Sequence, residues 1–301
     1  MHGNDYWVEK GEDKKMNIAF VILNYCTFNE TIECIRSVKK LSEDIRFVIV
    51  DNFSPDGSGE LLRNYYIDDS KVEIILSKKN LGFAKGNNLG YIKALEYNPD
   101  FIILSNSDIK IEQHDFFKKM FEVYQHTKFS VCGPDIINPY TNKHQSPFFT
   151  NMEISQKTIV KLVLRLVLRP FISKMKVLFS RTKPLMKKLQ TNSCLHGAFL
   201  IFSKNYIESN SEGIFDKTFM YGEEIILYFL SVKQKKSIYY APSLQVIHFE
   251  AGATKKINKT FFQKYVFRIK NELRSYFILN HLIKQYGPLT KEELSRFEDK
   301  S

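Results

Sequence analysis

The chain has 301 residues, of which 44% are hydrophobic, so it can bury a large core and is neither a disulfide-stapled miniprotein nor a disordered polymer. Lysine and arginine number 44 against 33 aspartate and glutamate residues, which gives a formal net charge of +11. Nearly the whole surplus lies between Lys157 and Lys188, where there is no acidic residue, so the charge favours one anionic surface partner over a generally basic protein.

Residues 1–15 are polar and charged, and we expect them to form an extension that precedes the fold. The first apolar run, Ile18 to Leu23, is too short for a signal peptide and lacks its flanks, so we do not expect export. No apolar run reaches the roughly 18 to 20 residues that cross a bilayer. The four cysteines have neither close pairing nor zinc-ribbon spacing, which indicates reduced, buried thiols in a cytoplasmic protein.

Short β-branched runs alternate with helix-like stretches from Asn17 onwards, which is typical of an α/β fold with a mostly parallel sheet flanked by helices. Four runs are apolar on both faces, as strands covered on both sides require. They are Ile18 to Leu23, Phe47 to Val50, Val72 to Leu76 and Phe101 to Leu104. Between the first two, apolar residues recur at helical spacing after Thr27 and Glu30, which we interpret as a capping box.

The basic segment fits two periodicities at once. From Lys161 to Arg169 its leucines and charges separate on a helix and also on a strand. Its length and Pro170 favour a short helix that ends at the proline. Further along the chain we expect strands at Gly197 to Phe202 and Ser237 to Tyr240, and helices at Glu223 to Lys233 and Phe261 to Lys284.

Polar residues follow three of the predicted strands, at the sheet edge where α/β proteins bind ligands. Asn24 follows the first strand, Asp51 to Ser58 the second, and Ser105 to Asp108 the fourth. Each of these alone is better explained by the hydrogen bonding of turn residues. Together with the glycine-rich and asparagine-rich run from Asn80 to Gly90, they indicate a ligand site.

Six stretches in this order resemble the inverting glycosyltransferases of family 2, which have the GT-A fold. The nearest subgroup is the rhamnosyltransferase-like and galactofuranosyltransferase-like enzymes of bacterial cell-surface polysaccharide synthesis. The matching stretches are Val50 to Ser58, Asn80 to Gly90, Leu104 to Ile109, His196 to Ala198, Phe215 to Glu224, and Tyr240 to His248.

The resemblance implies a division of the chain around one GT-A domain at residues 16–255. Its donor half spans about 16–110 and its acceptor half about 111–255, with a basic amphipathic insertion at about 153–190. The polar extension, 1–15, precedes this domain, and a helical extension, 256–301, follows it.

The resemblance also implies the donor site. Asp51 stands where the family reads the nucleotide base, and Asn24 lines the same cleft. The family's Asp-x-Asp motif appears here as Asn106, Ser107 and Asp108. The residues of the asparagine-rich run that we assign to the donor are Asn80, Gly82, Lys85 and Asn87.

A divalent metal ion, Mn²⁺ or Mg²⁺, is expected beside the donor diphosphate. Asp108 keeps the hard oxygen ligand that both ions prefer. His248 matches a histidine that some relatives use as a further ligand, and an imidazole would favour Mn²⁺. The alternative for His248 is a structural histidine without a metal.

The family's catalytic Glu-Asp pair reads Glu223 and Glu224 in this chain. We assign the general base to Glu224, at the place of the aspartate, because neighbouring helical residues point about 100° apart and only one can face the reacting centre. Glu223 is then an acceptor contact, together with His196, Gly197 and Tyr221. The alternative is that the two glutamates have a structural role only, because the helix dipole stabilises negative charge at the start of a helix.

We therefore predict transfer of a sugar from a UDP- or dTDP-linked donor to a glycan or a polyprenyl-diphosphate-linked acceptor in surface polysaccharide synthesis. The alternative is a degenerate homologue that binds nucleotide sugar or glycan without turnover. We expect residues 157–188 to contact the anionic inner face of the plasma membrane, the alternative being a solvated loop over the active site. No motif accompanies the charge that would indicate nucleic-acid binding. The sequence leaves the oligomeric state open.

Overall fold

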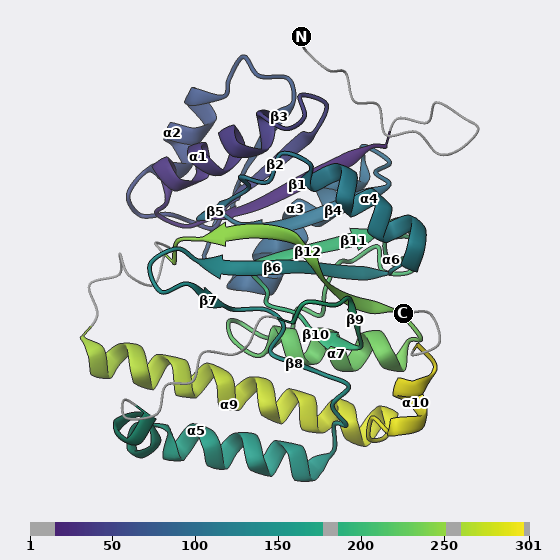
Figure 1. Ribbon diagram of the computed structural model, residues 1–301. Helices are drawn as coiled ribbons and strands as arrows, with labels where there is room; N and C mark the ends of the chain where they lie inside the picture. Colours follow the sequence, from purple (N-terminus) through teal and green to yellow (C-terminus); the bar gives the residue numbers. More distant parts are fainter. Residues whose placement is uncertain (1–15, 177–185, 251–259, 298–301) are drawn as a thin grey trace.

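The computed structural model describes residues 16–176, 186–250 and 260–297. A central sheet runs through the molecule and has helices on both faces (Figure 1). The strands along its main path lie in the order β3-β2-β1-β4-β11-β6-β12-β5. The predicted polar extension, 1–15, falls outside the described residues.

The first half of the sheet is parallel and confirms the four predicted strands. These are β1 (Ile18–Asn24), β2 (Arg46–Asp51), β3 (Val72–Leu76) and β4 (Phe101–Asn106). The alternate residues of β1 enter two cores: Phe20 and Ile22 face one, whereas Ala19 and Val21 face the other. This two-sided burial is why β1 is apolar without a break from Ile18 to Leu23.

The second half of the sheet mixes strand directions. Strand β11 (Phe199–Ser203) runs antiparallel to both β4 and β6 (Val131–Asn138), and β12 (Ile238–His248) runs parallel to β6. Strand β5 (Ile109–Lys110) pairs with the end of β12. Strand β12 is longer than the predicted run because its register shifts between Ala241 and Gln245, where a bulge accommodates Pro242.

Helices cover the two faces in separate groups. The first core contains residues of α1 (Phe28–Lys39), α2 (Ser58–Tyr65) and α4 (Phe116–Thr127). The second contains residues of α3 (Phe83–Leu95), α6 (Lys204–Ile207), α7 (Glu223–Lys233), α9 (Phe261–Tyr286) and α10 (Lys291–Ser295). Helix α7 has the predicted bounds, and α9 extends slightly beyond its prediction.

The remaining strands are short and lie between β6 and β11 in the sequence. They are β7 (Lys143–His144), β8 (Phe149–Thr150), β9 (Gln190–Thr191) and β10 (Ser193–Cys194). Strand β7 pairs with β6 and β9 with β12, whereas β8 and β10 form a small sheet of their own. All four cysteines are buried free thiols, as predicted.

Two predictions of local structure are wrong. Thr27 is at the N-cap of α1, but its side chain makes no capping hydrogen bond, because the hydroxyl is bonded to Asn24 and Ser107. Helix α5 (Gln156–Lys176) does not end at Pro170 but continues through it. A proline in a helix removes one backbone hydrogen bond, and here packing of α5 against α9 stabilises the helix across that loss.

The described helices include none that is both long enough and apolar enough to span a membrane.

Candidate active site

Asp51, at the end of β2, lies in a buried network of side-chain hydrogen bonds. Its Oδ1 accepts from Asn24 Nδ2 at 2.6 Å, and its Oδ2 accepts from the backbone N–H of Ser54 at 3.0 Å. A Cβ on Gly59 would lie 2.6 Å from the Asp51 carboxyl carbon, so the glycine leaves room for this carboxylate at the start of α2. The predicted base-reading pair therefore meets at the carboxyl ends of β1 and β2.

A second set of bonds links this network to the segment after β4. Thr27 Oγ1 lies 2.8 Å from Asn24 Oδ1 and 2.8 Å from Ser107 Oγ, and Thr31 also donates to Asn24. All four side chains are buried. The hydroxyl that the sequence suggested as a helix cap thus connects Asn24 to the central residue of the Asn106 to Asp108 motif.

Gly82 joins two motifs that are far apart in the sequence. Its φ of +80° is in the region that favours glycine, and a Cβ there would lie 2.2 Å from the carbonyl oxygen of Phe219. The next residue, Phe83, donates its backbone N–H to that same oxygen at 2.7 Å. Asn80 accepts from the N–H of Gly82 at 2.9 Å and from Asn52 Nδ2 at 3.2 Å. The start of α3 is thereby fixed against the segment that precedes α7.

Asp108 and His248 form a close pair on adjacent strand ends. Asp108 Oδ1 lies 3.3 Å from His248 Nε2, and both side chains are buried. The other ring nitrogen, Nδ1, lies 2.8 Å from Gln145 Oε1, and the Gln145 amide donates to Glu250 Oε1 at 2.5 Å. Since Glu250 fixes the Gln145 oxygen towards the ring, a hydrogen on Nδ1 can be donated to that oxygen, and Nε2 faces Asp108.

This pair fits a divalent cation. Ligands at adjacent positions of an octahedral ion are separated by about 3 Å when each bond is about 2.1 Å, and the Asp108 to His248 separation is close to that value. A neutral imidazole held through its other nitrogen is the usual form of a histidine ligand. The residues that the structure describes contain no cluster of three His, Cys, Asp or Glu ligands, so a cation here would need further ligands from water or the substrate.

His196 and Gly197 lie between the Asp108 pair and the glutamates of α7. The rings of His196 and His248 are 5.7 Å apart, and burial lowers the pKa of His196 to about 3, with the charge of His248 as the next cause. A Cβ on Gly197 would be 3.2 Å from Glu224 Oε1. His196 is therefore uncharged at neutral pH, and Gly197 allows the Glu224 carboxylate to approach the backbone.

The two glutamates at the start of α7 differ in their surroundings. Glu223 is buried, with Oε1 lacking a hydrogen-bond partner among the described residues, and burial followed by the charge of Glu224 raises its pKa to about 7. Burial also raises the pKa of Glu224, whereas hydrogen bonds to the backbone of Gly197 and Gly222 and the charge of Arg268 act in the opposite direction. Burial thus raises the pKa of both carboxyl groups, and a nearby cation opposes this effect at Glu224.

The turn before α7 is held by α9. Tyr221 and Gly222 have φ values of 69° and 88°, and Ser275 Oγ donates to the Tyr221 carbonyl oxygen at 2.6 Å. The Arg268 guanidinium lies over the Tyr221 ring, 5.0 Å from its centroid. The predicted C-terminal extension therefore contributes directly to the position of the glutamate pair.

Three predicted donor residues stay apart from these contacts. Lys85 is exposed on the first turn of α3, and Asn106 is half-buried at the end of β4. Asn87 is buried and donates to the carbonyl oxygen of Phe83 one turn earlier.

The structure brings five further residues to the site that the sequence did not identify as site residues. They are Thr27, Ser54, Ser58, Gln145 and Arg268. Ser54 lies within the Asp51 to Ser58 motif, whereas no motif in the sequence contains Gln145 or Arg268.

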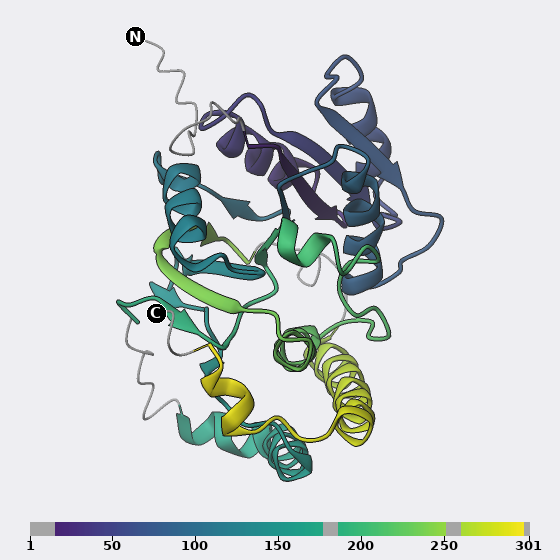
Figure 2. The same ribbon diagram turned by 90° about the vertical axis from the view of Figure 1, so that its right-hand side faces the viewer.

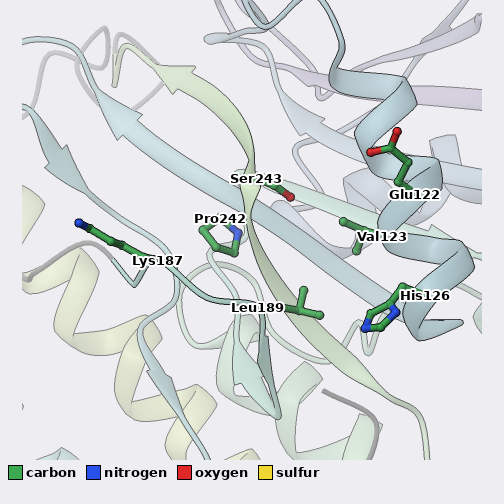
Figure 3. A pocket seen from close by; sticks show the side chains of 7 residues that line it. All are labelled: Glu122, Val123, His126, Lys187, Leu189, Pro242 and Ser243. Atoms are coloured by element: carbon green, nitrogen blue, oxygen red, sulfur yellow. The ribbon is translucent and has the colours of Figure 1, made fainter.

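A separate hollow of about 490 Å³ lies between α4 and the middle of β12 (Figure 3). Glu122, Val123 and His126 of α4 line one side, and Pro242 and Ser243 of β12 another. Ser243 precedes His248 by five residues, which is about 16 Å along a strand. The hollow includes no predicted site residue, so it is distinct from the Asp108 and Glu224 region.

The sequence is similar to known glycosyltransferases. The family model described as "Glycosyl transferase family 2" matches residues 20–208, which is more than half of the chain. The chain is 25% identical over 130 residues to "Glycosyltransferase GlyG" of Streptococcus pneumoniae serotype 4. That stretch covers 43% of this chain and 40% of the relative, so the chain matches about two fifths of the length of that protein.

Two solved structures are similar in fold. The crystal structure of GalNAc-T7 with UDP, GalNAc and Mn²⁺ has a TM-score of 0.58 at 11% identity, covering 93% of this chain and 56% of that one. The crystal structure of S. aureus TarS residues 1–349 has a TM-score of 0.48 at 14% identity, covering 76% and 61%. The similarity to GalNAc-T7 agrees with the family match and with the sheet described above, and the fold is GT-A, as predicted.

Proposed function

The chain belongs to glycosyltransferase family 2, and from this premise we propose that it is an inverting enzyme that transfers a sugar from a nucleoside diphosphate sugar to a hydroxyl group. One observation carries the proposal. A continuous set of contacts runs from the buried Asp108 and His248 pair, past His196 and Gly197, to the Glu224 carboxylate. This arrangement would bring the donor diphosphate and the base close together.

The donor nucleotide would lie at the carboxyl ends of β1 and β2. The Asp51 carboxylate can accept from an N–H of the base, and Asn24 holds that carboxylate in place. Asn80 and Gly82 shape the adjacent turn, while Lys85 and Asn87 follow on α3. UDP and dTDP are the donor nucleotides that we propose, since both present an N–H between two carbonyl groups. GalNAc-T7, which shares the fold, is known with UDP.

Asp108 and His248 would hold Mn²⁺ or Mg²⁺ beside the donor diphosphate, with Asn106 and Ser107 next to it. When bound, the ion neutralises charge that develops on the departing diphosphate. Gln145 keeps the His248 ring in the tautomer that leaves Nε2 free for the ion. GalNAc-T7 is known with Mn²⁺.

Glu224 would act as the general base. Its carboxylate takes the proton of the acceptor hydroxyl, whose oxygen forms a bond to the anomeric carbon as the bond from that carbon to the diphosphate breaks. Attack from the side opposite the leaving group inverts the configuration. His196, Gly197, Tyr221 and Glu223 surround this side of the cleft, and we propose that they contact the acceptor.

We place the enzyme with the rhamnosyltransferase-like and galactofuranosyltransferase-like subgroup, acting on a glycan or a polyprenyl-diphosphate-linked acceptor of a bacterial surface polysaccharide. The support is the resemblance of the six sequence stretches. Cytoplasmic synthesis is supported by the four buried free cysteines, which suit a reducing compartment.

Calorimetric titration with UDP, dTDP and GDP tests the proposal, each with Mn²⁺, with Mg²⁺ and with a chelator. We expect one nucleotide to bind in a metal-dependent way and Asp108→Ala to abolish the metal dependence, whereas Asp68→Ala, at an exposed carboxylate, should bind like the wild type. Absence of binding by all three nucleotides would refute a nucleotide-sugar site. Binding without hydrolysis or transfer of any sugar donor would identify the degenerate homologue.

A further inference from the structure

Two adjacent helices carry an unusual share of exposed apolar side chains. Helices α5 and α9 pack together at the end of the molecule opposite α1 and α2 (Figures 1 and 2). Half of the large hydrophobic side chains that are exposed in the described parts of the chain lie on these two helices. On α5 they are Val160, Leu164, Val167 and Leu168, and on α9 they are Phe262, Val266, Phe277 and Tyr286.

The exposed residues of α5 form a stripe. At 100° per residue, Val160, Leu164, Val167 and Leu168 fall within about a 100° sector of the helix. Each has between 47% and 58% of its surface exposed. The opposite side carries Ile159 and Leu162, which are partly buried against the second core, and Leu166, which is buried. Helix α5 therefore has one apolar face that packs against the protein and a second apolar face that is exposed.

A basic stripe runs beside the apolar one. Lys157, Lys161 and Arg165 are exposed, and they follow one another at four-residue spacing. Lys161 and Arg165 lie just beyond one edge of the apolar sector, whereas Lys157, near the start of the helix, lies within that edge. The sequence of α5 contains no acidic residue. A solvated charged surface would not need the apolar stripe, and a contact between copies of the chain would bring these like charges together.

We infer that the exposed face of α5 docks on an anionic lipid bilayer, with Leu164 and its apolar neighbours in the interface and Lys157, Lys161 and Arg165 among the headgroups. A helix that lies in the plane of a membrane surface has this combination of an apolar sector and flanking cations. Each cation near an anionic surface contributes about fivefold in affinity, so the three together contribute about 100-fold. This docking is independent of whether the protein transfers sugar.

Vesicle flotation tests the inference with the full chain. We expect the protein to float with vesicles of phosphatidylcholine that contain about one third phosphatidylglycerol, and not with phosphatidylcholine alone. The triple variant Lys157→Glu, Lys161→Glu, Arg165→Glu should lose at least about 100-fold in affinity for the anionic vesicles. The double variant Leu164→Ser, Leu168→Ser should also lose binding, although its charge is unchanged.

A matched control makes the same charge change elsewhere. Lys78, Lys79 and Lys118 are exposed and lie off α5, so their triple substitution by glutamate should bind vesicles far more tightly than the α5 variant. Circular dichroism and nucleotide titration of every variant separate a loss of docking from a loss of folding or of the proposed donor site.

Three outcomes would overturn the inference. One is failure of the wild type to bind anionic vesicles. Another is an equal loss in both triple variants, which would indicate a response to net charge alone. The third is a wild-type dimer in ultracentrifugation that the leucine variant dissociates without any change in vesicle binding, because this would identify the stripe as a contact between copies of the chain.

Discussion

Replacing Glu223 by glutamine should stabilise the protein more as the pH rises. Glu223 has only 7% of its surface exposed, and burial raises its pKa from 4.5 to about 7. The folded protein therefore holds this proton more tightly than the unfolded chain does. As a consequence, the wild type loses free energy of unfolding as the pH rises from about 4.5 through about 7, and Glu223→Gln, which does not titrate, escapes that loss.

The size of the effect follows from the two pKa values. A shift from 4.5 to about 7 corresponds to roughly 3 kcal/mol at high pH, and most of this develops between pH 5 and pH 8. The free energy of unfolding of Glu223→Gln, minus that of the wild type, should increase by this amount over the interval. Other titrating groups are common to both proteins and largely cancel in the difference.

Urea unfolding at pH 5 and pH 8 measures this difference. Glu212→Gln is the control, because Glu212 is exposed and the same substitution there should change the free energy of unfolding by a similar amount at both pH values. If the difference for Glu223→Gln were also the same at both, the carboxyl group would not be buried as described. The outcome bears on function, since a Glu223 that keeps its proton near neutral pH leaves Glu224 as the acceptor of a proton.

Three further predictions concern the site. Glu224→Gln should retain nucleotide binding by calorimetry while turnover falls by about 10² to 10⁴, and undiminished turnover would contradict its role as base. Gln145→Met should weaken Mn²⁺ binding in the presence of nucleotide about tenfold or more, measured by electron paramagnetic resonance. The reason is that the His248 ring loses the Gln145 oxygen as its hydrogen-bond acceptor. Unchanged affinity would exclude a role for Gln145 in positioning His248. Gly82→Ala should lower the free energy of unfolding by at least about 2 kcal/mol in urea titrations. The φ of +80° and the nearby Phe219 carbonyl oxygen both oppose a Cβ at this position. An unchanged free energy of unfolding would show that this loop relaxes.

The parallel half of the sheet and the helix α7 could be predicted from the sequence because local patterns determine them. A strand covered on both faces is apolar along its middle, as β1, β2 and β4 are, whereas the edge strand β3 is less buried and contains Glu73. The polar motifs at the ends of those strands could also be identified from the sequence. Parallel strands bring their carboxyl ends to one edge, which is why Asn24 and Asp51 were expected to meet.

Local patterns failed where distant segments compete for the same group. Thr27 has the residue type of a helix cap, but a buried bond to Ser107, 80 positions away, takes its hydroxyl. Pro170 would end an isolated helix, yet α5 continues because packing on α9 outweighs one missing backbone bond. In both cases a tertiary contact contributes more free energy than the local preference.

The sequence by itself determined the fold class and the family, together with most of the residues that stand at the site. Only the tertiary structure decided how those residues are paired. Pairing of Asp108 with His248 depends on β5 closing against the end of β12, and that of His248 with Gln145 on the segment after β7. Such contacts join residues more than a hundred positions apart, and no periodicity along the chain records them, because their energy comes from packing that exists only after the sheet has formed.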